Sequence, residues 1–410
     1  MPVNPKFISK NELRKIIQEN YIGFEKITKL DKQDFFGSSP PTIFIGSKLR
    51  YPQVNVGILS PPEETESAWI HDAQTYWPQT DFTIGDIIKL RSALINSRFT
   101  TTVKSFSSDN KFLDIAQEIG IGSKPVDIEI SLKKKPKFST SFDNIRLPMG
   151  PGVRLEKVRI TENVKVNPTV DKIISDVDLK ANDASNYLFS KGIDEHTISQ
   201  LLTIGVIGLK KNRKLVPTRF SITATDDNIG KNIINEIKDY NPIDDFRIYE
   251  GNYFGNYYYI LMFPGVFNYE LFEGYMPRSS WNPHSGEIKW ATDSETHFGR
   301  KTYAFNCVGG YYAARLPILQ YLKQMKRQAS VLVIRFETEE YYANLGVFVV
   351  RAAARKAMAN KPKTFDSQEN LLNYLKKAVY EKFKYNISII LNRSLMVNSI
   401  LKQKNLSSFY

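Results

Sequence analysis

The sequence contains very little cysteine: Cys307 is the single cysteine among 410 residues. One thiol excludes a disulfide within the chain and a zinc site built from several thiolates. Such a composition is typical of proteins in a reducing compartment, so we expect a cytoplasmic protein. Because Cys307 lies in the mixed stretch YAFNCVGG, we interpret it as a small core residue.

Long apolar runs and the common nucleotide-binding motifs are also missing. The chain has no run of about 18 consecutive apolar residues, and its first residues, MPVNPKFISKNELRK, lack the apolar core of a signal peptide. We therefore expect neither a membrane span nor a membrane partner. Glycine-rich loops of the Walker or Rossmann type and serine or cysteine triads are absent from the sequence. No cofactor is predicted on these grounds.

Positive charge is what the chain has in excess, with a formal net charge of +13. This excess favours an anionic partner, and DNA fits it best, which implies a location at the nucleoid. The basic run KKKPK, with Lys133, Lys134 and Lys135, follows a predicted strand. These lysines are candidates for contacts with a DNA backbone through counterion release. Alternatively, they form a solvated edge that blocks aggregation.

The hydrophobic periodicity changes repeatedly between strand and helix. Alternation at Val54–Ile58 and Val126–Leu132 predicts strands, FRIYEGNYFGNYYYILMFPG predicts a hairpin, and KLVPTRFSITATDD reads as a strand leading into a helix. Helices are predicted from Thr83, over 168–192 and 194–204, and through the later stretch SQENLLNYLKKAVYEKF. The mixture indicates an α+β or irregular α/β fold with two lobes, mixed sheets and packed helices. We expect domains at 1–165 and 166–400, followed by a flexible tail at 401–410.

The sequence closes on QKNLSSFY, with two aromatic residues at its last two positions. In a single 3₁₀ turn, residues three apart lie over each other, so Leu406 and Phe409 share one side with Tyr410 beside them. Gln403 would then hydrogen-bond at the edge of this apolar plug. The pattern resembles the box with which many proteins bind the sliding clamp of DNA replication, PCNA. It therefore predicts a clamp-binding segment, whose alternative is a tail folded onto its own domain.

Several stretches of the body resemble the archaeal Nre family of DNA-repair proteins. They are FGSSPPTIFIG, YPQVNVG, KLVPTRFSITATDD and GGYYAARLPILQYL, together with the clamp-binding box. The resemblance covers the chain from about residue 35 to its last residue and implies DNA repair at the clamp, with possible contacts to other repair proteins. Many members begin with a cysteine-rich, zinc-finger-like segment, which this chain does not have. The resemblance does not identify a chemical reaction, so it stays open whether the protein is an enzyme.

Catalytic residues are not evident, and Asp226 and Asp227 are the candidates that the sequence offers. In a metal-dependent nuclease, or another enzyme modifying DNA or nucleotides, such carboxylates would bind divalent ions. As the start of NIGKNIINEI, they would instead cap a helix. No metal site is predicted, and a divalent metal enters only with this enzyme alternative. Asp293, Glu295 and His297 fit a polar surface loop, and His71 with Asp72 form an isolated pair that we interpret as structural.

Two arginines lie within the stretches that resemble the family and could hold a phosphate. Arg50 is in GSKLRYP and Arg219 in VPTRFS. A guanidinium binds a phosphate through two parallel hydrogen bonds, although an internal ion pair explains each arginine equally well. The glycine and serines of FGSSPP would let backbone N–H groups approach an anion. The sequence as a whole predicts a DNA-repair factor with a basic body that binds DNA and a tail that binds the clamp.

Overall fold

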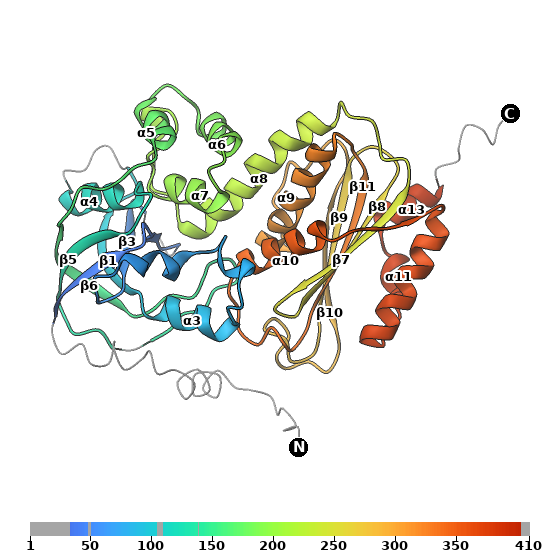
Figure 1. Ribbon diagram of the computed structural model, residues 1–410, viewed down its shortest axis with the longest axis horizontal. Helices are drawn as coiled ribbons and strands as arrows, with labels where there is room; N and C mark the ends of the chain where they lie inside the picture. Colours follow the sequence, from blue (N-terminus) through green and yellow to red (C-terminus); the bar gives the residue numbers. More distant parts are fainter. Residues whose placement is uncertain (1–32, 48–50, 105–109, 138, 403–410) are drawn as a thin grey trace, which may run out of the picture. The chain divides into compact units, whose positions relative to one another are not determined.

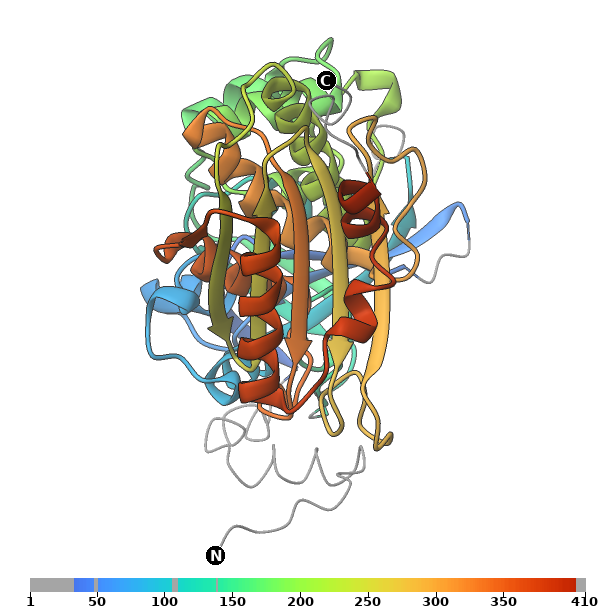
Figure 2. The same ribbon diagram turned by 90° about the vertical axis from the view of Figure 1, so that its right-hand side faces the viewer.

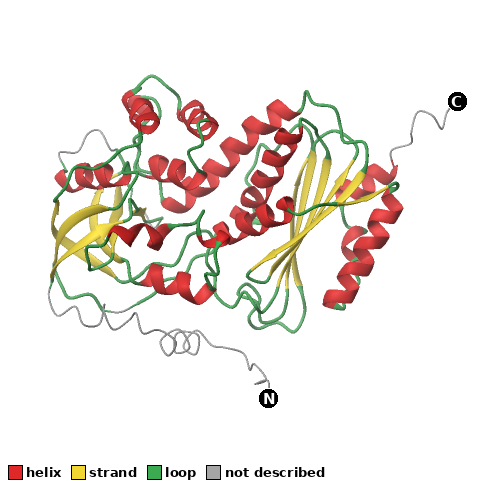
Figure 3. Ribbon diagram, viewed as in Figure 1, coloured by secondary structure: helices red, strands yellow, loops and turns green. Residues whose placement is uncertain are grey.

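The computed structural model describes residues 33–47, 51–104, 110–137 and 139–402, and the chain forms two compact units. The first unit consists of Met1–Ile229 with Ala343–Phe348, and the second of Gly230–Tyr342 with Val349–Tyr410. Each unit contains a six-stranded sheet and packed helices (Figures 1 and 3). The prediction of an α+β fold with two lobes is therefore confirmed. The domain boundary expected near residue 165 falls inside the first unit.

The sheet of the first unit has the strand order β1-β5-β6-β4-β3-β2. Neighbouring strands are antiparallel except β4 and β6, which are parallel. The strands are β1 Asp34–Ser39, β2 Ile43–Ile45, β3 Gln53–Ser60, β4 Ile95–Thr102, β5 Val126–Leu132 and β6 Gly152–Ile160. The two strands predicted from alternation are β3 and β5, and β5 buries every second residue as the pattern requires.

One face of this sheet is covered by helices. α4 (Lys111–Gly120) packs on β2, β3 and β6, and α7 (Glu195–Thr203) packs on β2. Phe99 of β4 points to this side, where its ring contacts Phe112 of α4. The neighbours of Phe99 along the strand therefore project from the opposite face, because side chains alternate. On β6 that opposite face presents exposed cations, among them Arg154 and Arg159.

Short helices connect the strands of the first unit. η1 (Glu66–Asp72), η2 (Trp77–Gln79) and α3 (Ile84–Ser92) join β3 to β4, and α5 (Pro168–Ser175), α6 (Ala181–Ser190), α7 and η3 (Lys210–Asn212) follow β6. The helix predicted from Thr83 is α3, and Thr83 and Asp86 form a capping box. The helix predicted over 168–192 is interrupted between α5 and α6. Asp194 caps α7 and thereby fixes the position of the first turn of this helix.

The strand predicted within KLVPTRFSITATDD is wrong, because this stretch forms the start of α8 (Thr218–Ile237). Its β-branched residues favour a strand by local propensity. Pro217 instead precedes the first helical residue, where its missing N–H costs nothing, and its carbonyl accepts from the N–H of Ser221. The burial of Ser221, Thr225 and Ile229 then follows a helical spacing. Tertiary packing has therefore overridden the local preference.

The sheet of the second unit has the order β10-β9-β11-β8-β7-β12, with β9 and β11 parallel and the other neighbours antiparallel. The strands are β7 Phe246–Tyr253, β8 Asn256–Phe263, β9 Asn268–Tyr275, β10 Lys289–Glu295, β11 Ser330–Glu337 and β12 Lys363–Phe365. The predicted hairpin is formed by β7 and β8. Gly255 lies in its turn at φ +71°, a conformation that glycine adopts without strain.

Helices cover both faces of the second sheet. They are α9 Val308–Met325, α10 Val347–Ala359, α11 Gln368–Phe383, α12 Ser388–Leu391 and α13 Leu395–Lys402. Figure 2 shows α11 and α13 lying across one face of the strands. Leu332 and Ile334 of β11 pack there in one apolar cluster with Leu371 and Leu375 of α11. On the other face, the ring of Tyr311 in α9 contacts Tyr269 of β9.

The described helices include none with both the length and the apolar character that crossing a bilayer requires.

Candidate functional site

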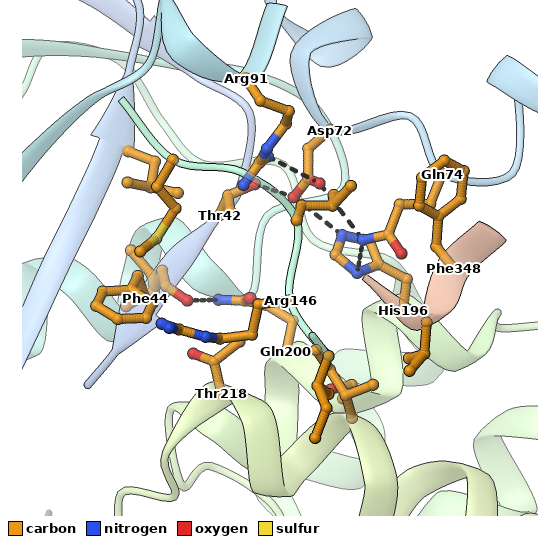
Figure 4. Close-up of a pocket in the computed structure, with 18 of the residues that line it drawn as sticks. Thr42, Phe44, Asp72, Gln74, Arg91, Arg146, His196, Gln200, Thr218 and Phe348 are labelled. Atoms are coloured by element: carbon orange, nitrogen blue, oxygen red, sulfur yellow. Dashed lines mark hydrogen bonds and ion pairs between the residues drawn. The ribbon is translucent and has the colours of Figure 1, made fainter. Parts of the chain in front are cut away.

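Asp72, at the end of η1, is the centre of a buried ion-pair chain in the first unit (Figure 4). Its Oδ1 lies 3.0 Å from Nη1 of Arg91, and its Oδ2 lies 3.0 Å from Nε2 of His196. Thr42 donates its hydroxyl to the same carboxylate, and Nε2 of Gln74 lies 2.8 Å from the other ring nitrogen of His196. Segments around residues 42, 72, 91 and 196 therefore meet at one carboxylate. Asp72 is thus not part of an isolated pair with His71.

Burial and charge act against each other on the ionisation of this chain. Burial by itself would raise the pKa of Asp72, but the neighbouring His196 and Arg91 hold it well below its ordinary value. Burial by itself would lower the pKa of His196, but the Asp72 carboxylate raises it. Arg91 and Asp72 each expose 4% of their side chains, whereas His196 exposes 28%. Of these three residues, His196 is therefore the one whose side chain reaches the surface.

A cavity of about 50 Å³ adjoins the ion-pair chain. Water needs roughly 10–15 Å³ of such space, so the cavity has room for a few waters or a small anion. The polar residues of its lining are the following: Thr42, Asp72, Gln74, Arg91, Arg146, His196, Ser199, Gln200 and Thr218. The remaining lining is mostly apolar and includes the following side chains: Phe44, Leu59, Met149, Ile222 and Phe348.

A wider hollow of about 320 Å³ shares Thr42, Asp72, Gln74, His196 and Gln200 with the small cavity. These shared residues form the wall between the two spaces. The lining of the hollow includes Pro40, Pro41 and Trp69, and Trp69 is 43% exposed. The volume of the hollow reaches the lower end of the range that is usual for ligand pockets.

A row of cations crosses the sheet beside the cavity. In register, Phe44 of β2 pairs with Gly57 of β3, Gly57 with Arg98 of β4, and Arg98 with Arg154 of β6. Paired residues in neighbouring strands project from the same face.

The ends of this row are two further cations. The guanidinium of Arg146 lies over the ring of Phe44, 4.8 Å from its centroid, and the N–H of Lys133 donates to the carbonyl of Arg154 at 2.9 Å. We call Arg146, Arg98, Arg154 and Lys133 the cation row.

The predicted basic residues are placed differently by the structure. Lys133, Lys134 and Lys135 are exposed after β5, and Lys133 belongs to the cation row. Arg219 is half-buried in the first turn of α8, next to Thr218 of the cavity wall, but does not line the cavity itself. Arg50 lies outside the described residues.

The serines of FGSSPP are already bonded within the first unit. Ser38 donates its hydroxyl to Asp127, and Ser39 donates to the carbonyl of Leu59 at 2.7 Å. Both serines lie in β1, which pairs with β5. Gly37 is needed for close packing, since a Cβ there would lie 2.1 Å from the carbonyl oxygen of Pro61. The backbone N–H of Ser38 likewise donates to the carbonyl of Glu63 at 3.1 Å, so these donors stabilise the first unit.

The carboxylates predicted as catalytic candidates lie in the middle of α8. Asp226 is buried and Asp227 half-buried, so neither caps a helix as the sequence suggested. Within the described part of the chain, no three His, Cys, Asp or Glu side chains gather in a way that could hold a metal ion. The residues predicted to bind the clamp, Gln403, Leu406, Phe409 and Tyr410, lie outside the described residues, which end with α13 at Lys402.

The second unit buries its own charges under α9, on the face of the sheet opposite α11. Arg335 of β11 contacts Glu273 at 2.5 Å and Glu337 at 2.9 Å. Arg315 of α9 contacts Glu295 of β10 at 2.6 Å, with both side chains fully buried. Burial would lower the pKa of Arg335, but Glu273 raises it well above its ordinary value. These arginines are therefore fixed by carboxylates.

The polar stretch around Asp293 and Glu295 was expected to be a surface loop, but it forms β10. Asp293 lies 3.1 Å from Arg300 and accepts from the N–H of Cys307. Cys307 is buried, as predicted.

Sequence reasoning missed Arg98, Arg146, Arg91 and His196. Their neighbours in sequence are ordinary, and their significance comes from segments far apart in the chain meeting at one place. The alternation of β4 and β6 could have suggested that Arg98 and Arg154 project from an exposed face. Without the strand order, however, nothing in the sequence indicates that the two are neighbours.

The chain matches known families over nearly all of its length. The family described as archaeal Nre, N-terminal, matches residues 12–282, and archaeal Nre, C-terminal, matches residues 295–409. The chain is 35% identical over 363 residues to DNA repair protein NreA of Archaeoglobus fulgidus, with 88% of both chains covered. It is 34% identical over 360 residues to DNA repair protein NreA of Haloferax volcanii, with 86% of this chain and 85% of the relative covered.

A third relative is DNA repair protein NreB of Archaeoglobus fulgidus, 34% identical over 346 residues, with 84% of this chain and 85% of the relative covered. No solved structure gives a significant match. Because the two family matches and these full-length relatives agree, the chain belongs to the archaeal Nre family.

Proposed function

We propose that this chain is a DNA-repair factor that the sliding clamp PCNA recruits through QKNLSSFY and that binds DNA through its basic body. The observation that carries the repair role is similarity, over 84–88% of this chain, to relatives named DNA repair proteins. Other repair proteins that use the clamp are expected to work beside it. The alternative of a metal-dependent nuclease requires divalent-metal turnover that is lost in Asp227→Ala without loss of folding.

The clamp interaction is supported by the chemistry of the box. Phe409 and Tyr410 would each bury about 150–250 Å² in an apolar pocket, which is enough for an anchor. Leu406 completes the plug, and Gln403 hydrogen-bonds at its edge. Ordering a short segment on binding limits the affinity, so we expect a dissociation constant in the low micromolar range, roughly −8 kcal/mol.

Calorimetric titration of the full chain into the archaeal sliding clamp tests this interaction. The double variant Phe409→Ala/Tyr410→Ala should lose binding, because both anchors are removed. The matched control Ser407→Ala/Ser408→Ala alters the same segment without touching the plug and should bind like the wild type. Equal affinity of the wild type and the plug variant, or no binding by either, would contradict recruitment through the box.

DNA binding is supported by the exposed cations of the first sheet. The cation row continues along β6 to Lys157 and Arg159, which are exposed. Cations arranged along one face neutralise successive phosphates and release counterions, so binding should weaken steeply with salt. Measuring the affinity for a DNA duplex at several salt concentrations tests this proposal. A salt-independent affinity, or no binding at low salt, would contradict it and leave a protein adaptor at the clamp.

A further inference from the structure

Arg98 is held in place by neutral groups. The side-chain oxygen of Asn96, with the amide turned toward Arg98, accepts from Nε at 3.2 Å and from Nη2 at 3.3 Å. Gly152 makes room for the guanidinium, because a Cβ at this position would lie 2.1 Å from its central carbon. Gly57, the register partner of Arg98 on β3, adds no side chain on this face. Arg98 is therefore oriented in advance without a carboxylate partner among the described residues.

Arg146 is held by an aromatic ring and a carboxylate, and one of its buried donors lacks an acceptor. Its guanidinium stacks on the ring of Phe44, and Nη2 donates to Asp143 at 2.8 Å. The buried Nε of Arg146 has no acceptor among the described residues. A buried donor without an acceptor is destabilising, and an oxygen of a bound ligand would supply the missing acceptor.

The two arginines lie in a region where like charges gather. Arg98 pairs directly with Arg154 across β4 and β6, and like charges at such positions destabilise a sheet. Burial lowers the pKa of Arg98, and the charge of Arg146 lowers it further. Among the described residues, the carboxylate that forms an ion pair with one of these arginines is Asp143, the partner of Arg146. The balance of charge is therefore positive where Arg146, Arg98 and Arg154 follow one another.

Buried arginines with a structural role look different in the same unit. Arg91 donates to Asp72, to the carbonyl of Pro148 and to the carbonyl of His71. Arg213 donates to the carbonyls of Gly208, Ile174 and Asp176. The guanidiniums of Arg91 and Arg213 have acceptors on several sides. Among the described residues, Arg98 and Arg146 together have more N–H donors than acceptors, and two positive charges beside the single carboxylate of Asp143.

We propose that Arg98 and Arg146 together bind the phosphate group of a phosphate monoester beside the cavity. Each guanidinium has donors beyond those that bind Asn96 or Asp143, and these can reach phosphate oxygens. Two cations also match a group that carries up to two negative charges. Such a group occurs at the end of a nicked or resected DNA strand and in free phosphate or mononucleotides. If the ligand is the phosphate at a DNA strand end, the inference rests on the proposed function. Binding of free phosphate does not depend on that function.

Thermal unfolding in phosphate-free buffer at constant ionic strength tests the site itself. Adding sodium orthophosphate should raise the melting temperature of the wild type, because the anion binds the folded state. Arg98→Gln and Arg146→Gln should lose this increase, whereas Arg159→Gln, which removes a cation from the same face, should keep it. Arg98→Lys retains the charge but loses the fork, so part of the increase should remain.

The melting temperature without phosphate separates ligand binding from a structural role. Removing one of two repelling charges should leave the melting temperature of Arg98→Gln unchanged or higher. A structural role predicts a lower melting temperature for the variant and no response of the wild type to orthophosphate. That pair of results would overturn the proposal.

Binding of oligonucleotides tests whether the bound phosphate belongs to a DNA strand end. The oligonucleotides share one sequence and carry a 5′-phosphate, a 3′-phosphate or no terminal phosphate. If a strand end is the ligand, a phosphorylated form should bind the wild type about tenfold more tightly than the unphosphorylated form, and the variants should not discriminate. A response to orthophosphate without such discrimination would assign the site to a small phosphate compound. Equal binding of all oligonucleotides without a response to orthophosphate would refute the site but leave DNA binding by the body intact.

Discussion

The two units of this protein contain similar sheets, but the arginines on these sheets differ in how many carboxylates balance their positive charge. In the second unit, Arg335 contacts two carboxylates and Arg315 contacts a fully buried one. In the first unit, the cation row passes along a partly open face, and Asp143 forms an ion pair with one member of the row, Arg146. Both sheets are mixed and six-stranded, so the sheet architecture does not cause the difference.

This contrast separates charges that stabilise a fold from charges that can bind a ligand. A buried charge is tolerated when its partners are fixed, and removing one partner leaves the other in a poor environment. Exposed or half-exposed cations without fixed partners contribute little to stability and remain available to an anion. The comparison predicts large effects on folding in the second unit and small ones along the cation row.

The largest effect is expected for Arg335→Leu in the second unit. The variant leaves Glu273 and Glu337 buried without their cation, so we expect a loss of about 3–5 kcal/mol in the free energy of unfolding. Chemical denaturation followed by circular dichroism measures it. Arg393→Leu, at an exposed arginine of the same unit, is the control and should change stability little. If both variants lost a similarly small amount of unfolding free energy, the buried ion pairs of the second unit would not stabilise its fold as this comparison predicts.

A smaller loss is expected for Asp72→Asn in the first unit. The amide keeps the shape but removes the charge that Arg91 and His196 share, which costs about 1.5–3 kcal/mol. The control is Asp81→Asn at an exposed position, and the measurement is again chemical denaturation. A variant as stable as the wild type would show that the ion-pair chain contributes nothing to folding.

His196 should make stability depend on pH. Because its pKa is raised in the folded protein, its contribution is present below the unfolded value near 6.5 and is lost as pH rises through the folded value. Between about pH 6 and pH 9, the wild type should therefore lose more stability than His196→Gln. His297→Gln, at an exposed histidine, should follow the wild type. Parallel pH profiles of wild type and His196→Gln would argue against the raised pKa.

The smallest effect on folding is expected along the cation row. Arg154→Gln should change the free energy of unfolding by less than about 0.5 kcal/mol, because the side chain is exposed. The same variant should reduce the slope of DNA affinity against salt by roughly one phosphate contact. Lys361→Gln, an exposed cation of the second unit, should leave the slope unchanged. An unchanged slope in Arg154→Gln would exclude this part of the row from DNA binding.

Local signals in the sequence were reliable where one interaction decides the structure. Thr83 and Asp86 predicted a helix start because a capping box involves neighbouring residues alone. The alternation of Val126–Leu132 predicted β5 because burial on one face imposes a period of two. Around Thr218–Asp227 the local preference failed, because a proline at the helix start and packing along α8 outweighed β propensity.

The sequence by itself determined the excess of positive charge, the α+β class and the resemblance to the Nre family, and it predicts the clamp-binding box. Each of these depends on composition or on residues close together in the chain. Only the tertiary structure decided that Asp72 joins Arg91 and His196, and that Arg98 lies in one row with Arg154 and with Phe44, the ring on which Arg146 stacks. The cation row depends on strand order and register, and the ion-pair chain depends on the packing of helices, which brings Asp72 and His196 together although they are 124 positions apart. No local pattern encodes that proximity, because it arises when the whole sheet and its connections fold.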